Sequence, residues 1–356
     1  ISGENVRLDV SEDRLKSHSE SSNTQYGVKA SASGWVVSAA QAVENAARSI
    51  EEDRDPRLSA IYAAQAGLNI ASQTMQSDMN PSAVKVTVSA TAGSSKQSQD
   101  YSSQQQQGTT IKAGESVNIS AEKDITGAGV NIAGKNVSLE AGRDITLATA
   151  QDKEALKNSA SGNQFSAGVG FGLGGSQNGF SIELGASTYS NKENGDGLVH
   201  HNSQVVADET LAVTSGRDTT LKGTELKGDK VAVDVGRNLT IASQQDEQNY
   251  DSKNKSGGVN VSICVPPICG GATVQASGTA NAAGGKVSNE YRSVIDQSGI
   301  YAGQGGFDIH VGEHTQLDGA VIASDATADK NRLDTGTLGW TDIENKAKSG
   351  GSQYAV

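Results

Sequence analysis

The stretch of residues 114–147, GESVNISAEKDITGAGVNIAGKNVSLEAGRDITL, decides the fold of this chain. A six-residue phrase recurs in it: a glycine, two polar residues, an aliphatic residue, a small or polar residue, and a second aliphatic residue. Self-similarity at a fixed period is the sequence sign of a repeat architecture. The phrase begins at Gly3, Gly114, Gly134, Gly142, Gly216, Gly228, Gly236, Gly306 and Gly312, with looser copies at Glu122 and Asp208.

The spacing of the phrase predicts the shape of the repeat. The starts at 114, 122, 134 and 142 and those at 208, 216, 228 and 236 have the same gaps of 8, 12 and 8 residues, so one coil takes about 20 residues. The two aliphatic residues of a phrase point to the same face of a strand. We therefore predict an all-β fold, a right-handed parallel β-helix that stacks Val117 under Val137 and Leu211 under Val231.

The composition supports a repetitive fold with a thin aliphatic core. The chain of 356 residues has 42 glycines, only 4% aromatic residues and a formal net charge of −12. This acidity argues against a nucleic-acid partner, and no run of 18 apolar residues occurs that could span a bilayer as a helix. The glycine of each phrase is expected to supply backbone freedom at a corner, and Arg143 and Asp144 are expected to face solvent. The chain begins in mid-pattern, so we expect a single β-helical domain, 1–356, that is a fragment of a longer protein.

Three excursions interrupt the predicted coils. In each, hydrophilic stalks lead to two strands with period-2 alternation, which predicts a β-hairpin arm extruded from the rod. The coils are expected at 105–151, 203–245 and 294–325, and the arms at 24–92, 160–190 and 256–284. Within the arms, the expected strand pairs are Tyr26 to Ser33 with Val84 to Ala92, Phe165 to Leu173 with Phe180 to Ala186, and Val259 to Val265 with Ala272 to Ala276.

The apolar side of these arms has two interpretations. The arms either fold back on the flank of the rod and bury this side, or display it to a partner surface or to lipid. Under the second interpretation, the contact residues are Phe165, Val169, Phe171, Leu173, Phe180, Ile182, Leu184, Val259, Val261 and Ile263.

The first arm contains an insert of different character at 35–80. Trp35, Val36, Val43, Ala47 and Ile50 share one helical face, and Asp55-Pro56 precedes a second helix bearing Leu58, Ile61, Tyr62, Gln65 and Leu68. These patterns predict a small αα-hairpin. Its apolar stripe is interpreted as packed core or, alternatively, as a groove for a partner.

Two cysteines flank the tip of the third arm. Cys264 and Cys269 enclose Val-Pro-Pro-Ile, which in an extracellular chain predicts a disulfide that pins the hairpin and stabilises it by about 2 kcal/mol. A zinc site would need two more ligands, and none is close in sequence, so no metal is expected.

Other motifs that look chemical have plainer interpretations. His310 to His314 matches the H-x-x-E-H pattern of zinc peptidases, but the surrounding alternation is that of a strand, not of a helix. Gly170, Gly172 and Gly175 match a phosphate-binding pattern without a following helix. His200 and His201 lie in a stalk and are expected to be solvated. With no pair of carboxylates to nominate as acid and base, we expect no catalytic residue, no cofactor and no small-molecule substrate.

Two sets of residues carry a family resemblance. Gly142-Arg143-Asp144-Ile145-Thr146-Leu147 and Gly236-Arg237-Asn238-Leu239-Thr240-Ile241-Ala242-Ser243-Gln244 resemble the haemagglutinin repeats of two-partner secretion exoproteins, the filamentous haemagglutinin family. The stretch 331–340, NRLDTGTLGW, is similar to that of contact-dependent growth inhibition effectors of CdiA type. The repeat resemblance covers nearly the whole chain.

The resemblance implies a function. It implies a secreted stick on the surface of a Gram-negative bacterium, exported through a dedicated outer-membrane transporter, that associates with the outer membrane or an outer-membrane protein of a target cell and helps to deliver a C-terminal toxin. One alternative is a passive adhesin shaft, and another is a carbohydrate-active β-helix.

Overall fold

The structure, a computed structural model, describes residues 1–33, 82–175, 179–264 and 275–356. Nearly all of these residues lie in β-strands, and the one helical element among them is a short 3-10 helix, η1 (Ala328–Lys330). The strands are β1 (Ser2–Gly3), β2 (Val6–Leu8), β3 (Ser11–Ser33), β4 (Ser82–Gln107), β5 (Thr110–Lys112), β6 (Ser116–Ala121), β7 (Ile125–Ala128), β8 (Asn131–Ala141), β9 (Ile145–Ala148), β10 (Ala150–Gly175), β11 (Gly179–His201), β12 (Ser203–Ser215), β13 (Thr219–Lys222), β14 (Thr224–Val235), β15 (Asn238–Ala242), β16 (Asp246–Cys264), β17 (Gln275–Ser293), β18 (Gly299–Asp318), β19 (Val321–Ser324), β20 (Arg332–Thr341) and β21 (Lys346–Ala355).

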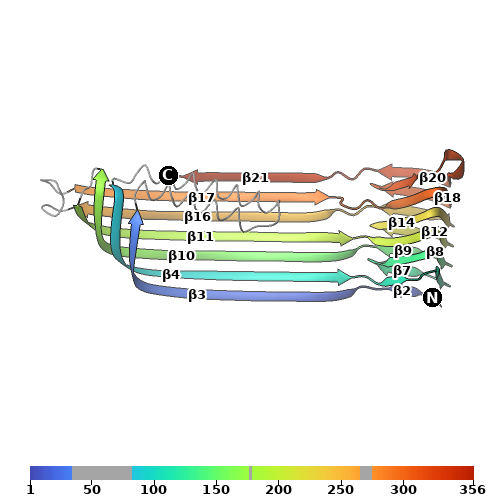
Figure 1. The fold of residues 1–356 in the computed structure, drawn as a ribbon, viewed down its shortest axis with the longest axis horizontal. Coiled ribbons are helices and arrows are strands. Elements are labelled where there is room, and N and C mark those ends of the chain that lie inside the picture. The colour runs from blue at the N-terminus through green and yellow to red at the C-terminus, as the bar shows by residue number, and fades with distance from the viewer. Residues whose placement is uncertain (34–81, 176–178, 265–274) are drawn as a thin grey trace.

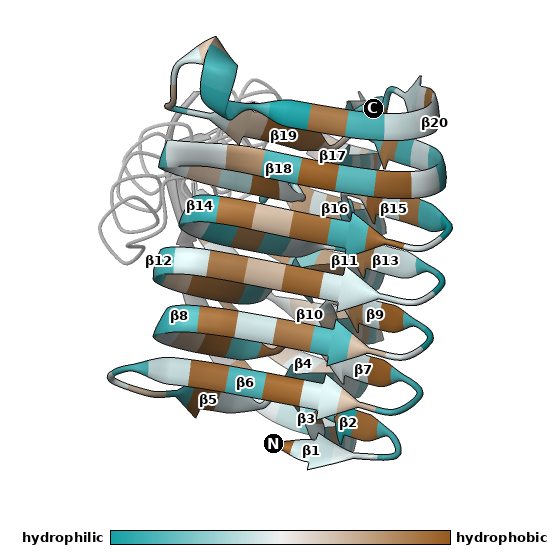
Figure 2. Ribbon diagram, turned by 90° about the vertical axis from the view of Figure 1, so that its right-hand side faces the viewer, coloured by the Kyte–Doolittle hydropathy of each residue, from teal (hydrophilic) through white to brown (hydrophobic). Residues whose placement is uncertain are grey.

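The described residues form two sheets, and the first is a parallel sheet of 14 strands that winds into a β-helix. Val117 lies beside Val137 and Leu211 beside Val231, which are the pairs that the sequence predicts. Figure 2 shows the strands in superposed turns, with apolar and more polar residues alternating along strands such as β6 and β8. The predicted β-helical architecture is therefore confirmed, while the hand of its winding stays a prediction.

The inward-facing aliphatic residues form the core of the β-helix. The inner strands of the β-helix bury alternate residues, as in the buried and exposed alternation of β6 and β12. Burial of such a side chain stabilises the fold by roughly 1.5–3 kcal/mol. The largest fully buried side chains are those of Ile119, Ile125, Ile132, Leu139, Ile145, Leu147, Leu211, Leu221, Leu226, Leu239, Ile241 and Ile300.

Glycines are required at one corner of the coil because there is no space for a side chain. A Cβ atom on Gly216 would overlap the carbonyl oxygen of Gly142 in the coil below, and one on Gly236 would overlap that of Gly216. Among the glycines that open a phrase, only Gly306 has a positive φ, of 76°. The prediction that these glycines supply backbone freedom is therefore wrong except at Gly306. At Gly142, Gly216, Gly236 and Gly312 the missing side chain instead allows one coil to approach the next.

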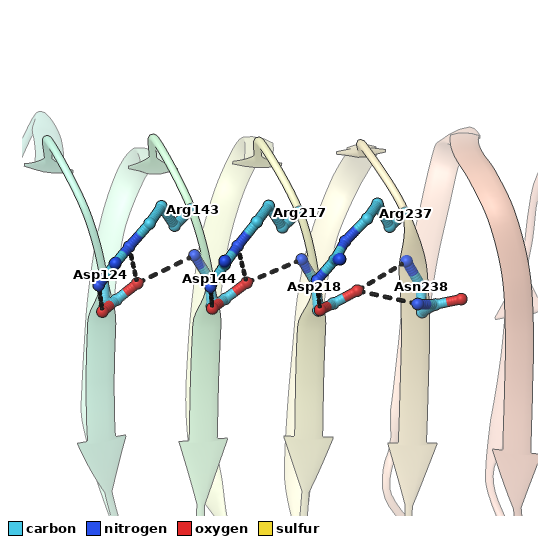
Figure 3. Close-up of polar contacts among 7 residues, drawn as sticks. All are labelled: Asp124, Arg143, Asp144, Arg217, Asp218, Arg237 and Asn238. Carbon is cyan, nitrogen blue, oxygen red and sulfur yellow. Dashed lines mark hydrogen bonds and ion pairs between the residues drawn. The ribbon is translucent and has the colours of Figure 1, made fainter.

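Asp and Arg residues next to this corner form a ladder between coils (Figure 3). Arg143 donates to Asp124 with Nε 3.0 Å from Oδ1, Arg217 donates to Asp144 at 3.1 Å, and Arg237 pairs with Asp218. Each carboxylate also accepts a hydrogen bond from a backbone N–H of the next coil. Arg143 and Asp144 are 42% and 28% exposed, so they reach solvent as predicted, and the ion pairs that they form also tie neighbouring coils together.

The ladder predicts an acid-sensitive rod. The hydrogen bond from Arg217 lowers the pKa of Asp144 below its ordinary value of 3.8, and the bond from Arg143 does the same for the pKa of Asp124. A carboxylate whose pKa is lower in the folded state stabilises the fold at pH values above its unfolded-state pKa. This stabilisation is lost as the pH falls through the folded-state pKa. When the pH is lowered beyond about 4, the midpoint temperature of thermal unfolding, followed by circular dichroism, is therefore expected to decrease.

The variant Arg217→Gln is the control for this acid effect. Without the guanidinium the pKa of Asp144 moves back toward its ordinary value, so the variant should be less stable at neutral pH and lose less stability on acidification. A variant whose pH profile runs parallel to that of the unchanged chain would contradict the role of the ladder.

The second sheet is antiparallel and has seven strands in the order β21-β17-β16-β11-β10-β4-β3. β10 pairs with β11 from Ala150 opposite His201 to Gly172 opposite Gly179, so the predicted stalks are themselves parts of the strands. β10 also pairs with β4, and β11 with β16. The three predicted arms are therefore not separate appendages but one sheet, because neighbouring hairpins satisfy the backbone groups at each other's edges.

The spacing of the rod explains why the hairpins meet. Between β4 and β10, and again between β11 and β16, the chain makes two superposed turns, in which Ile125 pairs with Ile145 and Thr219 with Leu239. Two turns advance by about two strand spacings, roughly 10 Å, and each hairpin adds two strands of the same spacing. Figure 1 shows the resulting sheet extending away from the β-helix instead of folding back on its flank.

The tip of the third hairpin departs from the predicted register. Ile263 pairs with Ala276 and Val259 with Ala280, so the return strand is shifted from the expected pairing of Val259–Val265 with Ala272–Ala276. Alternation fixes which face a residue occupies but not its partner across the strand. Cys264 is buried at the end of β16. Cys269 and the αα-hairpin predicted at 35–80 lie outside the described residues, so the disulfide and the helices stay predictions.

Candidate interaction face

The half of the antiparallel sheet farther from the rod has one apolar side, which we call the apolar face. Directly paired residues of neighbouring strands point to the same side of a sheet. One row across the sheet consists of Val88, Val169, Ile182 and Ile263. The large apolar residues of the face with described side chains are Tyr26, Val28, Val86, Val88, Phe165, Val169, Phe171, Phe180, Ile182, Leu184, Val259, Val261 and Ile263.

Large side chains of the apolar face are exposed to solvent. Their exposed fractions run from 38% for Val261 to 81% for Tyr26, with only Ile263 less exposed. The face measures about 20 Å in each direction at ordinary strand spacings. That is comparable with the largest apolar patch on a typical soluble protein, and such patches are often functional. The interpretation that the arms bury this side on the flank of the rod is therefore wrong.

The sequence predicts most of this face. Nine of the ten predicted contact residues lie on it, and the tenth, Leu173, pairs with Val84 at the next position of the same alternation, although its side chain is not described. Their role in contact stays a prediction. Tyr26, Val28, Val86 and Val88 were not among the predicted contacts, although they show the same alternation in the first hairpin.

Packing within the face is close where two aromatic rings meet. Phe171 lies directly opposite Phe180, with ring centroids 4.9 Å apart and planes inclined by 58°. Phe165 instead has small neighbours, Ala92 on one side and Ala186 on the other. The small neighbours of the Phe165 ring leave an open hollow. It is lined by Phe165, Val259, Gly257 and Ala280.

The opposite side of the same half of the sheet is polar and closely packed. Ser181 and Ser262 are only 7% exposed. Both hydroxyls donate to Oε1 of Glu183, Ser262 at 2.8 Å. The sheet is thus amphipathic, with a hydrogen-bonded polar side behind an exposed apolar side.

The residues that resemble catalytic or ligand-binding motifs lie in extended strands. His310 and His314 both belong to β18, so the prediction of a strand at this motif is confirmed. Nδ1 of His310 lies 3.6 Å from Oδ2 of Asp334, and Nδ1 of His314 is hydrogen-bonded to Oγ1 of Thr337 at 2.7 Å. The described ranges contain no cluster of His, Cys, Asp or Glu that could hold a metal ion.

The two histidines of the second hairpin differ from the prediction. His201 is half exposed, and its Nε2 lies 2.9 Å from Oδ2 of Asp152. The side chain of His200 is only 7% exposed, and its Nδ1 lies 3.4 Å from Oδ1 of Asp246. The prediction that both are solvated is wrong for His200, whose buried ring lies between Gln151 of β10 and Asp246 of β16.

Within the described part of the chain, no helix has the length and hydropathy to cross a membrane.

Comparison with known proteins identifies the family. The model of the hemagglutinin repeat family matches residues 88–257. The chain is 38% identical to a Toxin CdiA from Escherichia coli and 36% identical to a Deoxyribonuclease CdiA from Dickeya dadantii, each over 98% of its length. The chain is a haemagglutinin-repeat region of CdiA type. It spans 11% and 10% of these two relatives and 33% of a Deoxyribonuclease CdiA from Yersinia pseudotuberculosis, to which it is 38% identical. No solved structure matches the chain.

Proposed function

We propose that this region is a structural and recognition segment of a secreted exoprotein on the cell surface of a Gram-negative bacterium. In contact-dependent inhibition, its apolar face associates with the outer membrane of the target cell, or with an outer-membrane protein, and helps to deliver a toxin carried elsewhere on the exoprotein. A dedicated outer-membrane transporter exports the whole exoprotein. The region itself is proposed to have no enzymatic activity.

The observation that carries this proposal is the exposed apolar face. It is held away from the rod by strands of 19 to 26 residues, β3, β4, β10, β11, β16 and β17. A rod that served only as a spacer would have no need of such a face, and burial of exposed aliphatic and aromatic groups is a general source of affinity for lipid or for an apolar partner. The relatives that are named toxins and nucleases support a role in toxin delivery.

A flotation experiment with outer-membrane vesicles from target bacteria tests the proposal. The chain is expected to float with the vesicles. The double variant Val169→Ser/Ile182→Ser changes two directly paired residues that are 57% and 49% exposed. It is expected to bind about tenfold to a hundredfold more weakly, because it loses most of the burial of two aliphatic side chains.

The matched control changes two apolar residues of the same sheet whose positions in the alternation are on the opposite side. Val199 and Val287 are 43% and 37% exposed, and Val199→Ser/Val287→Ser is expected to float as the unchanged chain does. A chain that stays at the bottom of the gradient would show a passive shaft and contradict the proposal.

A further inference from the structure

Lysines form a row across the antiparallel sheet on the same side as the apolar face. Lys192 of β11 lies directly opposite Lys253 of β16, and Lys253 lies directly opposite Lys286 of β17. The strands are in unbroken register from here to the apolar face. Because each lysine is an even number of residues from an apolar-face position on its strand, all three side chains point to that side.

A second row, nearer to the apolar face, adds two more lysines. It runs from Lys96 through Ser161 and Ser190 to Lys255. We call Lys96, Lys192, Lys253, Lys255 and Lys286 the basic band. All five lysines are exposed, and the one acidic residue in the two rows is Glu20, on the edge strand β3.

The basic band is one-sided in an acidic chain. The chain carries 41 acidic and 29 basic residues. On the opposite side of the sheet, the corresponding rows contain only uncharged residues: Ser21, Gln97, Ala160, Asn191, Asn254, Gly285 and Gln353 in one, and Asn23, Ser95, Gly162, Tyr189, Ser256, Ala283 and Ala355 in the other.

The row of three lysines places like charges side by side. Like charges directly opposite each other destabilise an antiparallel pair. Among the residues that the structure describes, no carboxylate forms an ion pair with Lys192, Lys253 or Lys286, in contrast to Lys346, which pairs with Glu290 at 2.5 Å. Three unpaired ammonium groups on one surface make a ready site for a ligand with several negative charges.

We propose that the basic band binds the anionic phosphate groups of lipid headgroups while the apolar face contacts the acyl chains of the same membrane. This inference rests on the proposed membrane association and adds the class of lipid and the orientation of the sheet. The nearer row lies four residues, about 14 Å, from the row of Phe165 and Val259. From that row the apolar face continues for about 20 Å toward the tip. A sheet that lies with this side against the membrane surface therefore brings the lysines to the headgroups and the apolar face to the acyl chains.

Vesicle binding by the 356-residue chain tests the band. Two kinds of vesicle are compared at low ionic strength, phosphatidylcholine alone and phosphatidylcholine with anionic phosphatidylglycerol. The variant Lys192→Gln/Lys253→Gln/Lys286→Gln is expected to bind the anionic vesicles roughly a hundredfold more weakly than the unchanged chain, about fivefold per lysine. Added salt is expected to remove this difference, because it screens exposed charges.

The control variant Lys112→Gln/Lys222→Gln/Lys230→Gln removes the same charge from exposed positions on the rod. It is expected to keep the binding of the unchanged chain. The band variant should also unfold at an equal or higher temperature, since it relieves the repulsion between paired lysines.

The outcomes separate this inference from the proposed function. Equal binding of the unchanged chain to both kinds of vesicle, undiminished in the band variant but weakened by Val169→Ser/Ile182→Ser, would overturn the basic band and leave membrane association standing. Absence of binding to every vesicle, including those from target outer membranes, would overturn both.

Discussion

Replacing Leu221 with aspartate is expected to abolish cooperative folding of the β-helix. Leu221 is completely buried and lies between Leu147 in the coil below and Ile241 in the coil above. A carboxylate at this position would have no polar partner, and burial of an unpaired charge costs at least about 4–5 kcal/mol. That is a large part of the net stability of a typical folded domain.

Two further variants calibrate this result. Leu221→Ala removes the same contacts without adding charge, and it is expected to cost about 3 kcal/mol in urea unfolding followed by circular dichroism. Lys222→Asp places the carboxylate one position along β13, at an exposed residue, and should leave the urea midpoint nearly unchanged. Equal midpoints for Leu221→Asp and Lys222→Asp would mean that the aliphatic column is not the core.

The β-helix could be predicted because its signal is local and repeated. The phrase places two aliphatic residues on one face of a strand, and its recurrence gives the pairs Val117–Val137 and Leu211–Val231 directly. The reason for its glycines could not be predicted in the same way. Crowding of Gly216 against Gly142 depends on how closely successive coils approach each other, which only the three-dimensional structure shows.

The apolar face could be predicted, but not the sheet that carries it. Alternation in each hairpin fixes the side of residues such as Phe165 and Ile182. Pairing of β4 with β10, and of β11 with β16, is made largely by Ser, Asn, Gln and Gly residues, whose side chains carry little information about their partners. The basic band is a consequence of that pairing, because Lys192, Lys253 and Lys286 are far apart in sequence and meet only through strand register.

The second large effect is expected at the glycine column, in the variant Gly216→Ala. The added methyl group would overlap the backbone carbonyl of Gly142, and a backbone atom cannot rotate away as the end of a flexible side chain can. Overpacking of this kind costs about 1–3 kcal/mol, and we expect the upper part of that range in urea unfolding. The matched control is Gly114→Ala, since Gly114 opens the same phrase but a Cβ there would meet nothing within 4 Å.

The effect of Gly216→Ala is expected to reach the sheet as well as the rod. Gly216 lies in the two turns that separate the end of β11 from the start of β16, and these two strands are hydrogen-bonded neighbours. If the extra methyl group pushes one coil away from the next, two turns no longer match two strand spacings, and the β11–β16 pairing must stretch or slip. Hydrogen exchange in both strands should therefore be faster in Gly216→Ala than in Gly114→Ala. Exchange that is faster only in the rod would show that the sheet does not depend on the coil spacing.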